Sequence, residues 1–186
     1  TGAFICAMVI AISQGQAGGC VRVLIHSVRV FDGGVSALRD GAVLVDGNRI
    51  ARVVYAPETI EASAADTMID GKGGTLMPGT VEAHTHLTWA SSIEKIYHQF
   101  ILPPEELEIA ATRNARVLLD HGFTSAYSAG ALGDGIEVRL AAAIARGDTP
   151  GPRLVPSTLE RSPEGDEGVE TGDVFNGRGP DAMRAF

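Results

Sequence analysis

An alternation of strand-like and helix-like patterns in the second half of the chain constrains its fold most strongly. Apolar residues predict strands at residues 80–87, 123–128 and 153–156, and two helical patterns, which begin at Pro103 and Ile136, separate them. Strand, helix, strand, helix, strand at this spacing is typical of βα units, whose strands form a parallel sheet. The sequence therefore predicts an α/β fold for this part of the chain.

The ends of both helical patterns carry their own signals. Pro104 and the glutamates after it suit a first helical turn, where proline is tolerated and negative charge meets the positive end of the helix dipole. Gly122 and Gly147 follow the last periodic residues and suit the left-handed conformation that ends many helices. His121 is expected to cap the carboxyl end of the first helix rather than to bind a ligand.

Residues 21–79 have a different character and predict a small β domain. Alternation from Val21 to His26 predicts a strand with one apolar face and one mixed face. Asp46-Gly47-Asn48 separates two further strand patterns, and these residue types tolerate the positive φ angles of a tight hairpin. Pro78-Gly79 then ends the domain as a turn.

The composition limits the classes of partner. With 15 Lys and Arg against 23 Asp and Glu, the chain has a net charge of −8, whereas a nucleic-acid-binding surface needs a basic face. Hydrophobic residues make up 45% and charged residues 20%, which are values of an ordinary globular protein. Cys6 and Cys20 are too few for a disulfide framework. We expect no nucleic-acid partner.

Residues 1–20 are an apolar N-terminal extension with three interpretations. The run from Phe4 to Ile12 and the small residues after it are typical of a secretion-signal remnant. The segment could also be a non-native or disordered extension, or a structural element. The run is too short to span a membrane, which takes about 20 apolar residues. A cytoplasmic location is favoured, and export is expected if the segment is a signal remnant.

Two histidines at the end of the first strand of the βα series are the main functional signal. His84 and His86 are two residues apart, so a strand points both side chains to one face, with Cα atoms about 6.6 Å apart. Two imidazoles so placed can bind one metal ion, with Zn–N distances of about 2.0–2.1 Å. Active sites of βα barrels are built at the carboxyl ends of strands. We therefore expect a divalent metal ion, with zinc favoured.

The segment Thr75-Leu-Met-Pro-Gly-Thr-Val-Glu-Ala-His-Thr-His-Leu87 resembles the metal-binding signature of the amidohydrolase superfamily. Within that superfamily it is most similar to the imidazolonepropionase-like and Xaa-Pro dipeptidase-like enzymes. Further motifs follow in the family's order. The Asp-Gly-Asn hairpin resembles part of the small composite domain, and Gly122-Phe-Thr-Ser125 and Gly151-Pro-Arg-Leu-Val-Pro-Ser157 resemble the second and third barrel strands.

The resemblance implies a (βα)8 TIM-type barrel preceded by a small β-sandwich domain. Residues 21–79 would supply part of the sandwich, and residues 80–186 about three strands of the barrel. It also implies one or two divalent metal ions, usually zinc, and a metal-activated water that hydrolyses a C–N bond of an amide, cyclic amide or dipeptide-like substrate. In the family, further ligands and an aspartate that acts as general base and acid come from later strands, so no catalytic residue is assigned within this chain.

Four residues are candidates for contact with a small-molecule substrate. Many relatives carry an Arg-Asp pair near the end of the second barrel strand, where this chain has Tyr127-Ser128. These two residues could line the pocket or only pack. Tyr97 and His98 follow the first barrel strand, in a segment that could face the substrate.

The length predicts that the chain is the N-terminal part of a longer enzyme. A βα barrel takes about 250 residues, and 107 residues follow Gly79. Three strands cannot close a barrel, so the chain alone is expected to be inactive and marginally stable, with exposed apolar sheet edges. Alternatives are a deaminase or decarboxylase of the same superfamily, or a non-catalytic barrel scaffold that has lost the metal.

Overall fold

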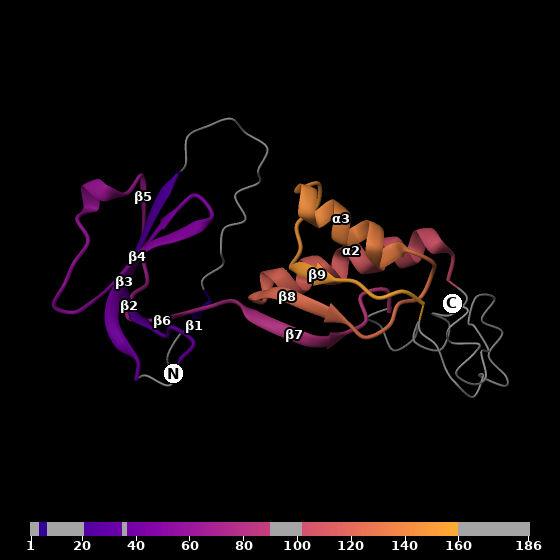
Figure 1. The fold of residues 1–186 in the computed structure, drawn as a ribbon, viewed down its shortest axis with the longest axis horizontal. Helices are drawn as coiled ribbons and strands as arrows, with labels where there is room; N and C mark the ends of the chain where they lie inside the picture. The colour runs from indigo at the N-terminus through magenta and orange to yellow at the C-terminus, as the bar shows by residue number, and fades with distance from the viewer. Residues whose placement is uncertain (1–3, 7–20, 35–36, 90–101, 160–186) are drawn as a thin grey trace. The chain divides into compact units, whose positions relative to one another are not determined.

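The structure, a computed structural model, describes residues 4–6, 21–34, 37–89 and 102–159 and has a mixed α/β architecture (Figure 1). The chain divides into two compact units, Thr1–Thr80 and Val81–Phe186, each with its own sheet. The boundary lies one residue beyond the predicted one. Within the described ranges, no helix has the length and apolar character needed to cross a membrane.

The first unit is built on one mixed sheet (Figure 1). Its strands are β1 (Phe4–Cys6), β2 (Arg22–Val30), β3 (Arg39–Asp46), β4 (Arg49–Tyr55), β5 (Thr67–Asp70) and β6 (Thr75–Met77). They lie in the order β1-β6-β2-β3-β4, and β5 also pairs with β2. A short 3-10 helix, η1 (Ala62–Ala64), precedes β5. The strand patterns predicted between residues 21 and 79 are confirmed.

β3 and β4 form the predicted hairpin. Asp46 pairs with Arg49, which leaves Gly47 and Asn48 as a two-residue loop. Gly47 has a φ of 58°, in the left-handed region that a tight hairpin turn requires. The turn therefore sets the register of this strand pair.

One edge of β2 is shared by two strands. Residues 23–26 pair in parallel with β5, and residues 29–30 pair in parallel with β6. A bulge lies between the two sections, where Ser27 has a φ of 55°. The backbone N–H of Gly71 donates to the carbonyl of His26 at 2.8 Å, so the turn between β5 and β6 is joined to the bulge.

β2 has one apolar face and one mixed face, as predicted, and both faces bury apolar side chains. Leu24 is 2% exposed and packs with Ala42 and Val54. The opposite face carries the larger cluster of Val23, Ile25, Val28, Val30, Val43 and Leu76. Leu24 lies between Arg22 and His26 in the alternation, and these polar neighbours conceal its burial in the sequence.

β1 lies within the apolar N-terminal extension. It pairs in parallel with β6, with Phe4 opposite Thr75. A short run of aromatic and β-branched residues can extend the open edge of a sheet, and periodicity does not separate such a strand from a signal segment. Residues 7–20 lie outside the described part of the chain.

The second unit confirms the predicted order of strand, helix, strand, helix and strand. Its elements are β7 (Thr80–Thr85), α2 (Pro104–Asp120), β8 (Phe123–Ser128), α3 (Ile136–Arg146) and β9 (Arg153–Val155). The strands lie in the order β7-β8-β9, and β8 and β9 are parallel. Figure 1 shows α2 and α3 together on one side of this sheet.

The predicted helix ends are also confirmed. α2 begins at Pro104, with two glutamates in its first turn. His121 caps the other end, where its Nδ1 donates to the carbonyl of Val117 at 2.8 Å. Gly122 and Gly147 follow the two helices with φ angles of 89° and 81°.

The core of the second unit lies between the helices and the sheet. Its buried members are Leu87, Leu107, Ala111, Ala115, Ala126, Leu132, Ile136, Leu140 and Leu154. The small side chains of Ala111 and Ala115 allow α2 to pack closely, because larger ones would overfill this space. Leu87 is 1% exposed, so the core also fixes the chain directly after the two histidines.

Candidate metal centre

His84 and His86 lie at the carboxyl end of β7, on the sheet face opposite the helices. Leu87 belongs to the core beneath the helices, so alternation along the strand points the two histidines to the other face. Their ring centroids are 5.2 Å apart, in an edge-to-face arrangement. The structure therefore brings the two rings together, as their spacing predicts.

The His86 ring is held in one orientation. Its Nδ1 lies 2.9 Å from the carbonyl oxygen of Gly130, and Nδ1 is the donor because a carbonyl only accepts. In the neutral ring the lone pair is then on Nε2, the nitrogen suited to a metal ion. Metal-binding histidines commonly donate their other N–H to a carbonyl or carboxylate in this way. The residues present therefore fit a divalent ion.

Trp89 covers the ring of His86. The two rings are stacked, with centroids 4.3 Å apart and planes 25° from parallel. The backbone N–H of Trp89 donates to the carbonyl of His86 at 3.3 Å. The indole Nε1 is buried and has no hydrogen-bond partner in the described part of the chain. The stack limits rotation of the imidazole and shields one of its faces from water.

Side chains from both sides fix the three residues after the histidine pair. The Nδ2 of Asn114, on α2, donates to the carbonyls of Leu87 at 2.8 Å and Trp89 at 2.9 Å. The hydroxyl of Thr88, which is 0% exposed, accepts the N–H of Leu132 at 2.8 Å. These bonds tie the end of β7 to α2 and to the loop before α3.

A buried carboxylate, Glu137, lies at the start of α3. It is 0% exposed and accepts the N–H groups of Leu87 at 3.1 Å and Ser157 at 3.5 Å. Burial raises the pKa of Glu137, and hydrogen bonds from the Ser128 hydroxyl and from the backbone of Ser157, Leu87 and Thr88 oppose that rise. One carboxylate thus joins the ends of β7, β8 and β9.

Tyr127 and Ser128 have different surroundings. Ala126 is 0% exposed in the core, so its neighbour Tyr127, 52% exposed, lies on the sheet face opposite the helices. This is also the face of the two histidines. The Ser128 hydroxyl lies 2.8 Å from the hydroxyl of Ser157 and belongs to the hydrogen-bonded group around Glu137. Tyr127 is therefore exposed, whereas Ser128 is held by hydrogen bonds.

The other predicted substrate residues, Tyr97 and His98, lie outside the described residues. Within the described ranges, no group of three His, Cys, Asp or Glu side chains is placed to hold a metal ion. His84 and His86 come together there without a third side chain of these types.

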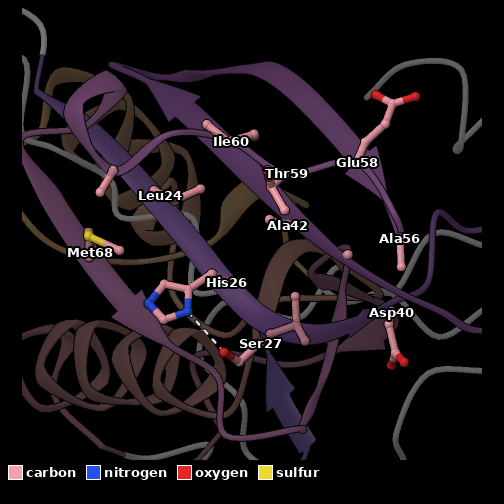
Figure 2. Close-up of a pocket in the computed structure, with 13 residues that line it drawn as sticks. Leu24, His26, Ser27, Asp40, Ala42, Ala56, Glu58, Thr59, Ile60 and Met68 are labelled. Atoms are coloured by element: carbon pink, nitrogen blue, oxygen red, sulfur yellow. Dashed lines mark hydrogen bonds between the residues drawn. The ribbon is translucent and has the colours of Figure 1, made fainter.

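A separate cavity of about 390 Å³ lies in the first unit (Figure 2). Leu24 lines its wall, and His26, bonded to Ser27 at 2.9 Å, lies on one side. The exposed carboxylates of Asp40 and Glu58 lie on the other side. Since these polar groups do not converge on one point, the cavity has no ligand set comparable to the histidine pair.

The sequence profile of the Amidohydrolase family matches residues 75–176, more than half of the chain. The match includes both histidines and every strand and helix that the structure describes in the second unit. The chain belongs to the amidohydrolase family.

Two curated relatives match this amidohydrolase over shorter stretches. The 5′-deoxyadenosine deaminase of Methanothermobacter thermautotrophicus is 44% identical over 66 residues, which are 36% of this chain and 14% of that protein. The imidazolonepropionase of Ectopseudomonas mendocina is 43% identical over 67 residues, which are 36% of this chain and 16% of that protein. The matched stretch therefore spans less than a fifth of either relative.

A solved structure is similar over more of the chain. A Xaa-Pro dipeptidase with bound methionine in its active site superposes with a TM-score of 0.65 at 23% identity. The alignment covers 80% of this amidohydrolase and 38% of the dipeptidase chain. The two proteins share a fold over that stretch.

Three residues around the histidine pair were not among the candidates from the sequence: Glu137, Asn114 and Trp89. Glu137 lies on one helical face with Leu140 and Ile144. A carboxylate within such an apolar stripe was the one sequence signal of its burial. An acidic residue in a first helical turn is equally suited to the helix dipole, which conceals that signal. Asn114 likewise interrupts the apolar stripe of α2.

Proposed function

We propose that this amidohydrolase is the N-terminal part of a metal-dependent enzyme that hydrolyses a C–N bond of a small molecule. The observation that carries the proposal is the orientation of the His86 ring. His86 lies beside His84 at the end of β7, and its Nδ1–H donates to the carbonyl of Gly130. An amide, a cyclic amide or a dipeptide-like compound is the proposed substrate. The similarity to an imidazolonepropionase and to the fold of a dipeptidase supports this class.

His84 and His86 would hold the divalent ion, with zinc preferred because imidazole nitrogens suit it. When bound, such an ion lowers the pKa of a water molecule and polarises the substrate carbonyl. Gly130 directs the lone pair of the His86 ring, and Trp89 excludes water from one face of that ring. Tyr127 is the proposed substrate contact, because it is exposed on the same sheet face.

Among the described residues the site is incomplete. A catalytic zinc site has three protein ligands, whereas the described residues bring two together. We infer that further ligands and the general base come from later βα units, and that β7, β8 and β9 begin a barrel. The coverage of 38% of the dipeptidase chain supports this inference. The first unit would then form part of the small composite domain.

A deaminase is the second candidate. The relative that acts as a 5′-deoxyadenosine deaminase is 44% identical over the stretch it shares with this chain. Deamination also breaks a C–N bond by addition of water, so the same two histidines would serve either reaction.

Metal analysis and assays of the full-length protein test the proposal. We expect stoichiometric zinc and hydrolysis of a member of a dipeptide and cyclic-amide panel. His84→Asn and His86→Asn should each lose zinc and activity, because each removes one of the two imidazole ligands. His121→Asn changes only a helix cap and should retain both. Wild-type protein that binds no divalent metal would overturn the proposal, and ammonia release from an aminopurine nucleoside would favour the deaminase.

A further inference from the structure

We propose that Glu137 is a positioning residue of the metal centre, whose buried carboxylate sets the place and orientation of the His86 ring. The proposal rests on the proposed metal-dependent function. Glu137 would act through hydrogen bonds to the backbone on two sides of the ring, not as a metal ligand.

The first connection runs to the strand that carries His86. One carboxylate oxygen accepts the N–H of Leu87, the next residue, at 3.1 Å, and the N–H of Thr88 is also hydrogen-bonded to Glu137. Leu87 and Thr88 are 1% and 0% exposed, so water has no access to replace the carboxylate. Its loss would leave two buried donors unsatisfied, and this segment would have to move to recover partners.

The second connection runs to the group that orients the ring. Glu137 accepts the N–H of Ser157, and the Ser157 hydroxyl lies 2.8 Å from the Ser128 hydroxyl. The oxygen of that Ser128 hydroxyl lies 3.5 Å from the backbone nitrogen of Gly130. The carbonyl of Gly130 accepts from Nδ1 of His86. One carboxylate therefore fixes both the backbone that carries the imidazole and the carbonyl that selects its tautomer.

The burial of Glu137 separates this role from a helix-dipole role. An acidic residue that only stabilises the start of a helix can remain in water, as Glu105 does in the first turn of α2. A buried carboxylate costs free energy unless its oxygens are hydrogen-bonded. The donors to Glu137 come from residues that follow β7 and β9. The two histidines lie at the first of these strand ends.

Zinc affinity in two shape-matched variants of the full-length protein tests the proposal. Glu137→Met fills a similar volume but accepts no N–H hydrogen bond of comparable strength, whereas Glu137→Gln keeps one acceptor oxygen for Leu87. We expect the Met variant to raise the Kd for zinc about 10- to 100-fold and to alter the visible spectrum of the Co²⁺-substituted protein. The Gln variant should restore most of the affinity. Glu105→Met is the exposed control and should change neither.

The outcomes separate this proposal from the proposed function. Unchanged zinc affinity in the Met variant overturns the role of Glu137 and leaves the metal site intact. Equal loss in the Met and Gln variants also overturns it, because the acceptor would then make no difference. If the Met variant does not fold, Glu137→Asp takes its place, because its side chain is one methylene too short to reach Leu87. This variant should show the same loss of zinc affinity. A normal zinc affinity would overturn the role of Glu137. Wild-type protein without zinc affinity overturns both proposals.

Discussion

A metal-binding imidazole needs a fixed tautomer, and at His86 the carbonyl of Gly130 supplies it. The ring is also stacked on Trp89. A histidine on a flexible chain would lose rotational freedom when it binds a metal ion, and that cost opposes binding. At His86, much of this rotational freedom is already lost when the chain folds. The metal affinity of the site should therefore depend on residues that never touch the metal.

Glu137 should make stability depend on pH. Because burial raises its pKa, folded Glu137 keeps its proton over a pH range in which the unfolded chain has released it. Its contribution to the free energy of unfolding is then full below the ordinary pKa and is lost as pH rises through the raised one. Glu137→Gln does not titrate, so it should gain stability relative to wild type as pH rises above the ordinary pKa of a glutamate carboxyl. Urea unfolding of both metal-free proteins across this range is the measurement; a constant difference would contradict the expectation.

Asn114 should contribute to stability through the two carbonyls that it satisfies. Asn114→Leu removes the donor to Leu87 and Trp89 and should lower the free energy of unfolding by about 1–3 kcal/mol, because the acceptors are left unpaired. Arg113→Leu, at the exposed neighbouring position, is the control and should have little effect. Chemical denaturation measures both. Equal stability of the two variants would show that the carbonyls find other partners.

The histidine pair could be predicted from the sequence, whereas its supporting residues could not. Strand alternation alone places His84 and His86 on one face. Gly130, which fixes the ring of His86, lies 44 residues further along the chain. Such a contact depends on how β7 and the loop after β8 pack, and periodicity holds no information about it.

At the scale of elements, Gly41 is required by the close approach of β3 to β4. A Cβ atom at Gly41 would lie 2.3 Å from the backbone oxygen of Val54. This oxygen cannot move without disrupting the pairing of β3 with β4. Gly41→Ala should therefore lower the free energy of unfolding of the first unit by about 1–3 kcal/mol. Gly34→Ala is the matched control, because its new Cβ would meet only the movable carboxylate of Asp32 at 3.1 Å. Thermal melts that shift equally would contradict this account.

Local patterns predicted nearly every element in the described part of the chain. Hairpin chemistry at Gly47 and helix ends at Gly122 and Gly147 are short-range properties, so the residues themselves specify them. The bulge at Ser27 and the edge of β2 shared by β5 and β6 depend instead on strands distant in sequence. The order of strands in the first sheet therefore could not be predicted from local sequence patterns.

At the scale of the whole molecule, the sheet of the second unit has one covered face and one exposed face. Helices α2 and α3 pack on the first (Figure 1). On the other, Tyr127 and Val155 are partners in the β8–β9 register and are 52% and 45% exposed. Apolar residues exposed side by side on a sheet are unfavourable in water. The proposed barrel would place them in its interior, together with the two histidines.

This exposed face predicts how residues 1–186 should behave when produced alone. Two histidines are one ligand short of a catalytic zinc site, and an uncovered apolar sheet face favours association and loose packing. We expect no hydrolase activity, zinc binding far weaker than in the full-length protein, and strong binding of an apolar dye such as ANS. His86→Asn should then change little in the isolated segment, although we expect it to abolish zinc binding in the full-length protein. A cooperative melt with tight zinc binding and activity in residues 1–186 would show that the three strands and two histidines suffice, and would refute the proposal of a longer barrel.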